Sequence, residues 1–150
     1  MIPETWHEGE VAVIGMGRSG CAATKFLESH GLHVYLSDAA DSASLREVAG
    51  RLSSANVAID VGRHDLERIA RASAVIASPG VQPDAPPLST ARDVGVEILA
   101  ELDLAAMFLQ DTQLIVVTGT NGKTTTTALL AHILAQQVAR NSLPATSACR

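Results

Sequence analysis

A glycine-rich segment at residues 15–20, GMGRSG, lies directly between an apolar run and an alanine-rich stretch. The apolar run at 11–14 predicts a buried strand, and residues 19–30 predict a helix. Gly15 and Gly17 permit a tight turn and the close approach of the backbone to a pyrophosphate, while the third glycine lets the helix pack on the strand. A strand, a glycine turn and a helix in this order predict a nucleotide-binding βαβ unit.

The rest of that unit follows in the sequence. Gly31 is placed to end the helix in the left-handed C′ conformation, and residues 33–37 predict a second strand that stops at Asp38. An acidic residue about twenty positions after the glycines occupies the place that hydrogen-bonds a ribose in dinucleotide sites. The alternative is a glycine-rich turn that only packs a helix against a strand.

A second glycine loop, GTNGKTT at residues 119–125, follows another apolar run at 114–117. The run predicts a strand, and the residues after the loop are compatible with a helix. Lys123 would then place its charge at the β- and γ-phosphates of a nucleoside triphosphate, and the Thr124 hydroxyl would bind Mg²⁺. The loop is shorter than the general phosphate-binding pattern, whose first glycine would fall at Val117. The alternative is an ordinary strand-turn-helix with an exposed lysine.

Strands and helices alternate up to residue 100 with short connections. This order predicts an α/β fold with a Rossmann-like parallel sheet and helices on both faces. The other predicted elements are helices at 42–52 (with Asp41 or Ser42 as N-cap), 84–93, 66–70 and 101–108, and strands at 56–61, 74–77 and 96–99.

A polar break at residues 110–112 predicts a domain boundary. Residues 1–110 would form the first domain. Residues 111–150 would form only the start of a second, truncated ATP-binding domain, because one strand and one helix cannot bury a core of their own. We expect the apolar face of its helix to dock on the first domain or to cause association. That face consists of Leu129, Leu130, Ile133 and Leu134.

Charge, hydropathy and cysteine content exclude several classes of protein. The net charge is −5 with acidic and basic residues interspersed, which argues against a nucleic-acid partner. No apolar run approaches the roughly 20 residues needed to cross a bilayer, and the N-terminus lacks the features of a signal peptide. The two cysteines, Cys21 and Cys149, have no metal-ligand or disulfide spacing, so we expect a cytoplasmic location. The five histidines lie apart and predict no metal site.

Several stretches together resemble the Mur ligase family of ATP-dependent enzymes, which build the peptide stem of peptidoglycan. The loop VVTGTNGKTT at 116–125 resembles the ATP loop of that family. The resemblance covers residues 10–136 and is strongest to the member that adds D-glutamate. The nearest rival adds L-alanine to UDP-N-acetylmuramate, but its glycine turn usually reads GxGGxGM. The other stretches that carry the resemblance are VAVIGMGRSG at 11–20, SDA at 37–39, ASPGV at 77–81 and GVEILAELDLA at 95–105.

The resemblance implies that the first domain holds the UDP part of UDP-N-acetylmuramoyl-L-alanine. Arg18 and Ser19 would face the diphosphate and ribose, and Asp38 would lie near the uracil and ribose. The loop 78–80 would wall the uracil pocket. The sequence departs from the family at 39–40, where Ala-Ala replaces a hydroxyl and a basic residue. The implied UDP-site residues are Gly15, Gly17, Arg18, Ser19, Asp38, Ser78, Pro79 and Gly80.

The activity that the resemblance implies is amide ligation with ATP and Mg²⁺ as cofactors. The terminal carboxylate of UDP-N-acetylmuramoyl-L-alanine attacks the γ-phosphate, and the amine of D-glutamate then displaces phosphate from the acyl phosphate. We expect no nucleic-acid or membrane partner, and a monomer at full length. The implied ATP-binding residues are Gly119, Thr120, Asn121, Gly122, Lys123, Thr124 and Thr125, with Lys123 as the catalytic residue and Thr124 as the magnesium ligand.

The resemblance ends near residue 137, and residues 138–150 show no periodicity. We hypothesise that this tail is the out-of-frame end of a truncated gene; the alternative is a native disordered terminus. The chain as written would then be an inactive N-terminal fragment. Two other functions remain open. An NAD-binding oxidoreductase domain would use the first glycine turn and Asp38 but has no use for the second loop, and a non-catalytic module would only bind nucleotide.

Overall fold

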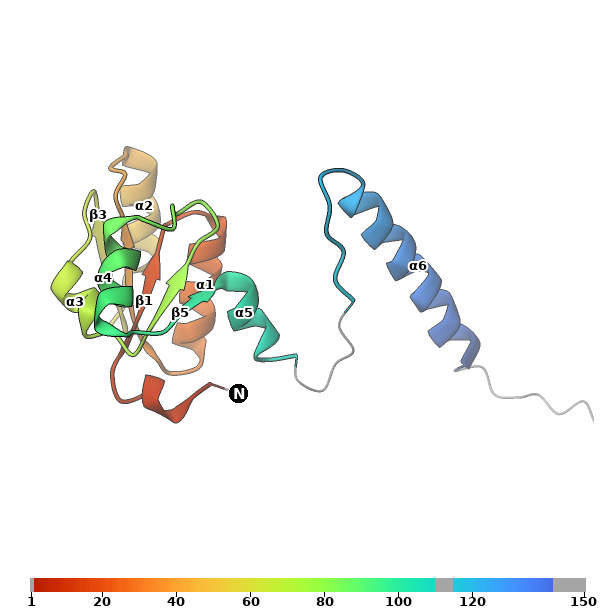
Figure 1. Cartoon of the computed structure of the whole chain (residues 1–150), viewed down its shortest axis with the longest axis horizontal. Helices are drawn as coiled ribbons and strands as arrows, with labels where there is room; N and C mark the ends of the chain where they lie inside the picture. The colour runs from red at the N-terminus through yellow and green to blue at the C-terminus, as the bar shows by residue number, and fades with distance from the viewer. Residues whose placement is uncertain (1, 110–114, 142–150) are drawn as a thin grey trace, which may run out of the picture. The chain divides into compact units, whose positions relative to one another are not determined.

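The computed structural model describes residues 2–109 and 115–141 (Figure 1). The chain divides into two compact units, Met1–Asp111 and Thr112–Arg150, which are described separately. Our expectations for residues 142–150 of the tail lie outside the described residues. Within the described ranges, no helix combines the length and the apolar character that crossing a bilayer requires.

The first unit is built on a five-stranded parallel sheet with the strand order β3-β2-β1-β4-β5. The chain enters at the centre, winds to one edge and then returns to build the other half, so the strand order reverses between β1 and β4. This arrangement confirms the predicted α/β fold. The strands are β1 (Glu10–Ile14), β2 (His33–Asp38), β3 (Val57–Val61), β4 (Ala74–Ala77) and β5 (Ile98–Ala100).

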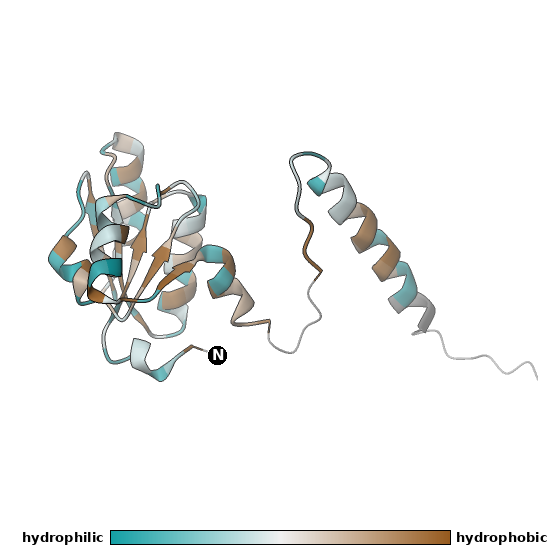
Figure 2. Cartoon of the chain, viewed as in Figure 1, coloured by the Kyte–Doolittle hydropathy of each residue, from teal (hydrophilic) through white to brown (hydrophobic). Residues whose placement is uncertain are grey.

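Helices cover both faces of the sheet because successive strand side chains point to opposite sides. Val11 and Val13 of β1 join the core beneath α1, α2 and α5, whereas Ala12 and Ile14 join the core beneath α3 and α4. Figure 2 shows the sheet strands as the most apolar part of this unit. The helices are α1 (Arg18–Ser29), α2 (Ala43–Leu52), α3 (Leu66–Ala70), α4 (Pro86–Val94) and α5 (Glu101–Ala106), after a 3-10 turn at Glu4–Trp6.

Local hydrogen bonds account for where the elements begin and end. Of the two predicted N-caps of α2, Asp41 and Ser42, it is Ser42 that caps the helix, by accepting from the Leu45 N–H at 3.2 Å. Gly31 follows α1 with φ +79°, as predicted. The last strand begins later than the sequence predicted. The Val96 N–H still donates to the Ala91 carbonyl at 2.9 Å to close the end of α4, so β5 starts two residues further along.

The second unit contains one helix, α6 (Lys123–Asn141), among its described residues. The strand predicted at 114–117 is wrong for residues 115–117, which are not in a strand; Leu114 lies outside the described residues. A strand needs a neighbour to satisfy its backbone groups, and the described part of this unit has none. Ile115 and Val116 are accordingly exposed.

Candidate functional site

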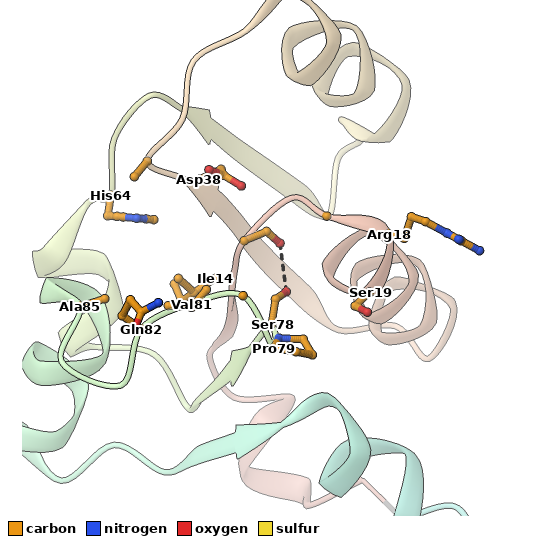
Figure 3. A pocket seen from close by; sticks show the side chains of 14 residues that line it. Ile14, Arg18, Ser19, Asp38, His64, Ser78, Pro79, Val81, Gln82 and Ala85 are labelled. Atoms are coloured by element: carbon orange, nitrogen blue, oxygen red, sulfur yellow. Dashed lines mark hydrogen bonds between the residues drawn. The ribbon is translucent and has the colours of Figure 1, made fainter. Parts of the chain in front are cut away.

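One cavity lies at the carboxyl ends of β1, β2 and β4, where the strand order reverses (Figure 3). Ligands bind at this place in open parallel sheets. Its volume is about 520 Å³, within the range of small-molecule sites. The structure brings together every residue predicted for the UDP site. These are Gly15, Gly17, Arg18, Ser19, Asp38, Ser78, Pro79 and Gly80.

The glycine turn forms the floor of the cavity, and its glycines differ in what they do. Gly15 has φ +100°, a conformation that L side chains rarely adopt. Gly20 lies in the first turn of α1, where an added Cβ would meet the Gly15 carbonyl oxygen at 1.9 Å. Around Gly17 the space is open, with no atom within 4 Å of a Cβ position. The turn therefore packs tightly behind the cavity and leaves room on the side where a ligand would lie.

Helix α1 starts at this cavity without a side-chain cap. Gly17 is its N-cap residue and makes no side-chain hydrogen bond, so the first backbone N–H groups of the helix are available to an anion. Arg18 and Ser19 are the first helical residues. Figure 3 shows the Arg18 side chain extending away from Asp38 and Ser78, so the backbone at this end of the helix, rather than the guanidinium, faces the cavity.

Asp38 holds two loops together at the end of β2. One carboxylate oxygen accepts from the Met16 N–H at 2.7 Å, inside the glycine turn. The other accepts from the Ala40 N–H at 2.8 Å, in the loop that follows β2. The expected position of this carboxylate near the uracil and ribose stays a prediction, and the hydrogen bond to Met16 shows that it fixes the backbone of the turn. Ala39 also lines the cavity and supplies no polar side-chain atom there.

The 78–80 loop forms the wall opposite Asp38. Ser78 Oγ donates to the Gly15 carbonyl oxygen at 3.3 Å, the contact drawn in Figure 3, and its N–H donates to the Ile14 carbonyl at 3.0 Å. Pro79 and Gly80 then turn the chain across the cavity. The loop after β4 is thus tied directly to the glycine turn after β1.

His64 is the functional candidate that sequence reasoning missed. Its Nδ1 lies 2.9 Å from the Ser37 hydroxyl, and burial lowers its pKa while the charge of Asp38 opposes that shift. No motif contains this histidine; only the folding of the β3–α3 loop brings it to the cavity. The other lining residues outside the predictions are Ile14, Ala39, Val81, Gln82 and Ala85.

The second glycine loop leads into α6 in the other unit. Gly119 and Gly122 have φ +150° and +78°, where glycine is favoured, and Lys123 is the first residue of the helix. The Lys123 ammonium donates to the Gly119 carbonyl and, at 3.4 Å, to the Thr120 carbonyl, so the loop curls around the charge. Thr124 and Thr125 are exposed in the first turn. A curled loop, a lysine and hydroxyls at a helix start fit a triphosphate with Mg²⁺.

Two family models match this chain. The Mur ligase MurD-like, N-terminal domain matches residues 9–100, and the Mur ligase middle domain matches residues 117–148. The second match extends beyond residue 137, where we placed the end of the resemblance. The expected end at residue 137 was therefore too early; it rested on the lack of hydrophobic periodicity after that residue.

Relatives and solved structures agree with these models. UDP-N-acetylmuramoylalanine–D-glutamate ligases from Gloeobacter violaceus and Microcystis aeruginosa are 47% and 44% identical over 83% of this chain. The chain spans only 28% of each of these curated relatives. The UDP-N-acetylmuramate-alanine ligase MurC of Thermotoga maritima is 29% identical with a TM-score of 0.56, over 84% of this chain and 29% of that chain. A pseudomurein peptide ligase type C from Methanothermus fervidus is 28% identical with a TM-score of 0.55, over 85% of this chain and 26% of that chain.

Proposed function

Because the chain belongs to the Mur ligase family, we propose that its first unit binds the uridine diphosphate part of UDP-N-acetylmuramoyl-L-alanine. One observation carries this proposal: a single cavity at the uncapped start of α1 is lined by all the residues to which the family resemblance assigns that ligand. The N–H groups of the turn and of the helix start would hold the diphosphate. The space between Asp38 and the 78–80 loop would hold the nucleoside.

We further propose that the complete protein is an ATP-dependent ligase of peptidoglycan synthesis that adds D-glutamate. The relatives named for D-glutamate are 35% to 47% identical to the chain, whereas the alanine ligase of Thermotoga maritima is 29% identical. The MurD-like match of the first unit points the same way. Together these favour D-glutamate over L-alanine as the amino acid.

In this proposal ATP supplies the phosphate that turns an unreactive substrate carboxylate into an acyl phosphate. Lys123 would bind the phosphates, the Thr124 hydroxyl would hold Mg²⁺, and Asn121 and Thr125 would shape the loop. These residues act by position and charge, which is how proteins promote phosphoryl transfer. The chain alone spans little more than a quarter of its relatives, so we propose that it binds nucleotide without performing ligation.

Calorimetric titration of the purified chain with UDP, NAD and Mg-ATP tests the binding part. The proposal predicts saturable UDP binding and a clear preference for UDP over NAD. Preferential NAD binding would instead support a dinucleotide-binding oxidoreductase domain and refute the proposal. If the chain binds UDP but the chimera described next shows no effect of its residues on ligation, only a non-catalytic nucleotide-binding module would be supported.

A chimera tests the ligation part. Residues 1–136 would replace the matching part of the Gloeobacter violaceus ligase, and the product would be assayed for D-glutamate addition. Lys123→Ala should then lower turnover at least ~100-fold, comparable to the loss of one oxyanion-hole donor. The other lysine of the chain, Lys25, is exposed on α1 and gives the matched control Lys25→Ala, which should leave turnover unchanged. Near-normal turnover of the Lys123→Ala chimera would refute the role of the loop.

A further inference from the structure

The β3–α3 loop is fastened to the end of β2, and this places His64 at the cavity. The Gly62 N–H donates to the Asp38 carbonyl at 2.9 Å, and Arg63 forms an isolated antiparallel bridge with Asp38. Gly62 has φ +83°, and an added Cβ would lie 3.1 Å from the Asp41 Cβ, so the tight turn depends on glycine. The residue after the bridge, His64, is therefore held next to Asp38 by backbone pairing.

The imidazole is fixed on one side and open on the other. Nδ1 is 2.9 Å from Oγ of Ser37, a side chain that is fully buried in β2. Within the described residues nothing hydrogen-bonds Nε2, and the ring is half-buried on the cavity wall. Figure 3 shows the ring reaching from its loop toward the space between Asp38 and Val81. A buried hydroxyl thus orients a ring whose second nitrogen has no hydrogen-bond partner among residues 2–109 and 115–141.

The charge state of His64 suits an uncharged ligand. Burial lowers its pKa below the ordinary histidine value of 6.5, and the nearby Asp38 carboxylate opposes this only in part. The ring is therefore mainly neutral at pH 7, and a neutral imidazole offers one donor and one acceptor rather than a charge for a phosphate. Asp38 is the charged group that acts on it, and its carboxylate already accepts from backbone N–H groups.

The position of His64 in the cavity points to the base rather than the diphosphate. An anion is favoured at the start of α1, and His64 lies on the other side of Asp38 from that helix (Figure 3). The neighbouring wall is formed by the apolar side chains of Ala39, Val81 and Ala85, together with the polar side chain of Gln82. Of the two polar side chains here, His64 and Gln82, His64 is oriented by a buried partner, the Ser37 hydroxyl, so we take it as the candidate contact for the end of a nucleotide farthest from its phosphates.

We infer that Nε2 of His64 hydrogen-bonds the imide edge of the uracil base and so selects uridine over cytidine. This inference rests on the proposed binding of UDP in the same cavity. We assign the tautomer in which Nδ1 accepts from the Ser37 hydroxyl and Nε2 carries the proton, so that Nε2–H donates to O4 of uracil. Cytosine has an amino group in place of O4, and this donor cannot accept the hydrogen bond. Losing one such hydrogen bond weakens binding about 3- to 10-fold.

Two variants, His64→Asn and His64→Gln, distinguish the proposed contact of Nε2 with the ligand from the structural contact of Nδ1 with Ser37. The amide of His64→Asn reaches about as far as Nδ1 and can keep the Ser37 contact, while the amide of His64→Gln reaches about as far as Nε2. Calorimetry on the full chain should show wild type preferring UDP to CDP. His64→Asn should bind UDP about 3- to 10-fold more weakly and lose that preference, while His64→Gln should bind UDP as wild type does.

Each other outcome overturns the inference. If His64→Asn binds UDP with wild-type affinity and preference, Nε2 does not contact the base. If both variants weaken UDP and CDP equally, His64 supports the loop or faces the phosphates. If wild type binds UDP and CDP equally, the imide edge is not recognised at all. Failure of wild type to bind UDP would instead refute the proposed function, so the two failures are distinct. The fluorescence of Trp6, the single tryptophan and buried in the core, verifies that each variant is folded.

Discussion

The substitution Gly20→Ala has two opposite effects on stability, one from helix propensity and one from packing. Gly20 lies in the first turn of α1, and alanine in a helix is favoured over glycine by about 1 kcal/mol. Propensity alone therefore predicts that Gly20→Ala stabilises the fold. The new Cβ would, however, lie 1.9 Å from the Gly15 carbonyl oxygen and 2.9 Å from Ser78 Oγ. The first of these is backbone, so the clash is relieved only if the glycine turn or the helix moves.

The packing term should win. Overpacking a tight site costs about 1–3 kcal/mol, and a backbone contact this short belongs at or above the upper end. After the propensity gain, we expect a net loss of about 2 kcal/mol, which lowers the melting temperature of a unit of this size by roughly 10 °C. The displaced turn should also weaken UDP binding, because its N–H groups would no longer converge on the diphosphate.

Urea and thermal unfolding followed by Trp6 fluorescence measure this loss in the first unit. Gly50→Ala is the matched control, because Gly50 lies in α2 with no atom within 4 Å of a Cβ position. It should stabilise the unit by about 0.5–1 kcal/mol. A Gly20→Ala protein as stable as Gly50→Ala would refute the close contact between α1 and the turn.

Three further predictions follow from the hydrogen bonds and charges of the first unit. Burial lowers the pKa of His64, so on acidification the unfolded chain takes up a proton before the folded one, and stability should fall as the pH drops below 6.5. The urea midpoint of His64→Gln should therefore depend less on pH between 7.5 and 5.5 than that of wild type. The same pH dependence in both proteins would contradict this. Asp38→Asn turns one carboxylate acceptor into an amide donor that faces a backbone N–H, so it should lower the free energy of unfolding by about 1–3 kcal/mol and weaken UDP binding. A variant with wild-type stability would exclude the two hydrogen bonds of this carboxylate. Arg68 makes a bidentate ion pair with Glu10 at 2.5 and 2.6 Å, and its guanidinium lies 4.6 Å over the Tyr35 ring. Arg68→Ala should therefore lower the free energy of unfolding by about 1 kcal/mol. Arg46→Ala, which breaks an exposed ion pair, should leave the urea midpoint unchanged.

The parts of the site that the sequence could predict are those that depend on local chain chemistry. The glycine turn, Asp38 and the 78–80 loop each follow directly after a buried strand. Parallel strands bring their carboxyl ends to one edge, so these residues meet whatever the details of packing. The same reasoning placed one helix end at Gly31 and narrowed another to Asp41 or Ser42, because caps are decided within a few residues.

The parts that escaped prediction depend on contacts between distant segments. His64 reaches the cavity through the pairing of Arg63 with Asp38 and through the hydroxyl of Ser37, which no local pattern reveals. Likewise, the apolar run at 115–117 has the composition of a strand, but a strand forms only where a neighbour pairs with it. The hydrogen bond by which Asp38 fixes the glycine turn also depends on the fold, because it joins Asp38 to the distant Met16 N–H.

The most direct test of the account is to map UDP on the ¹⁵N-labelled chain by NMR. The account predicts that UDP shifts the amide signals of Gly15, Gly17, Ser19, Asp38 and Gly80 in a saturable way. It predicts little change for residues of α6, and no matching shifts on addition of NAD at the same concentration. Saturable shifts confined to other parts of the chain, or none in the glycine turn, would contradict the assignment of this cavity as the uridine nucleotide site.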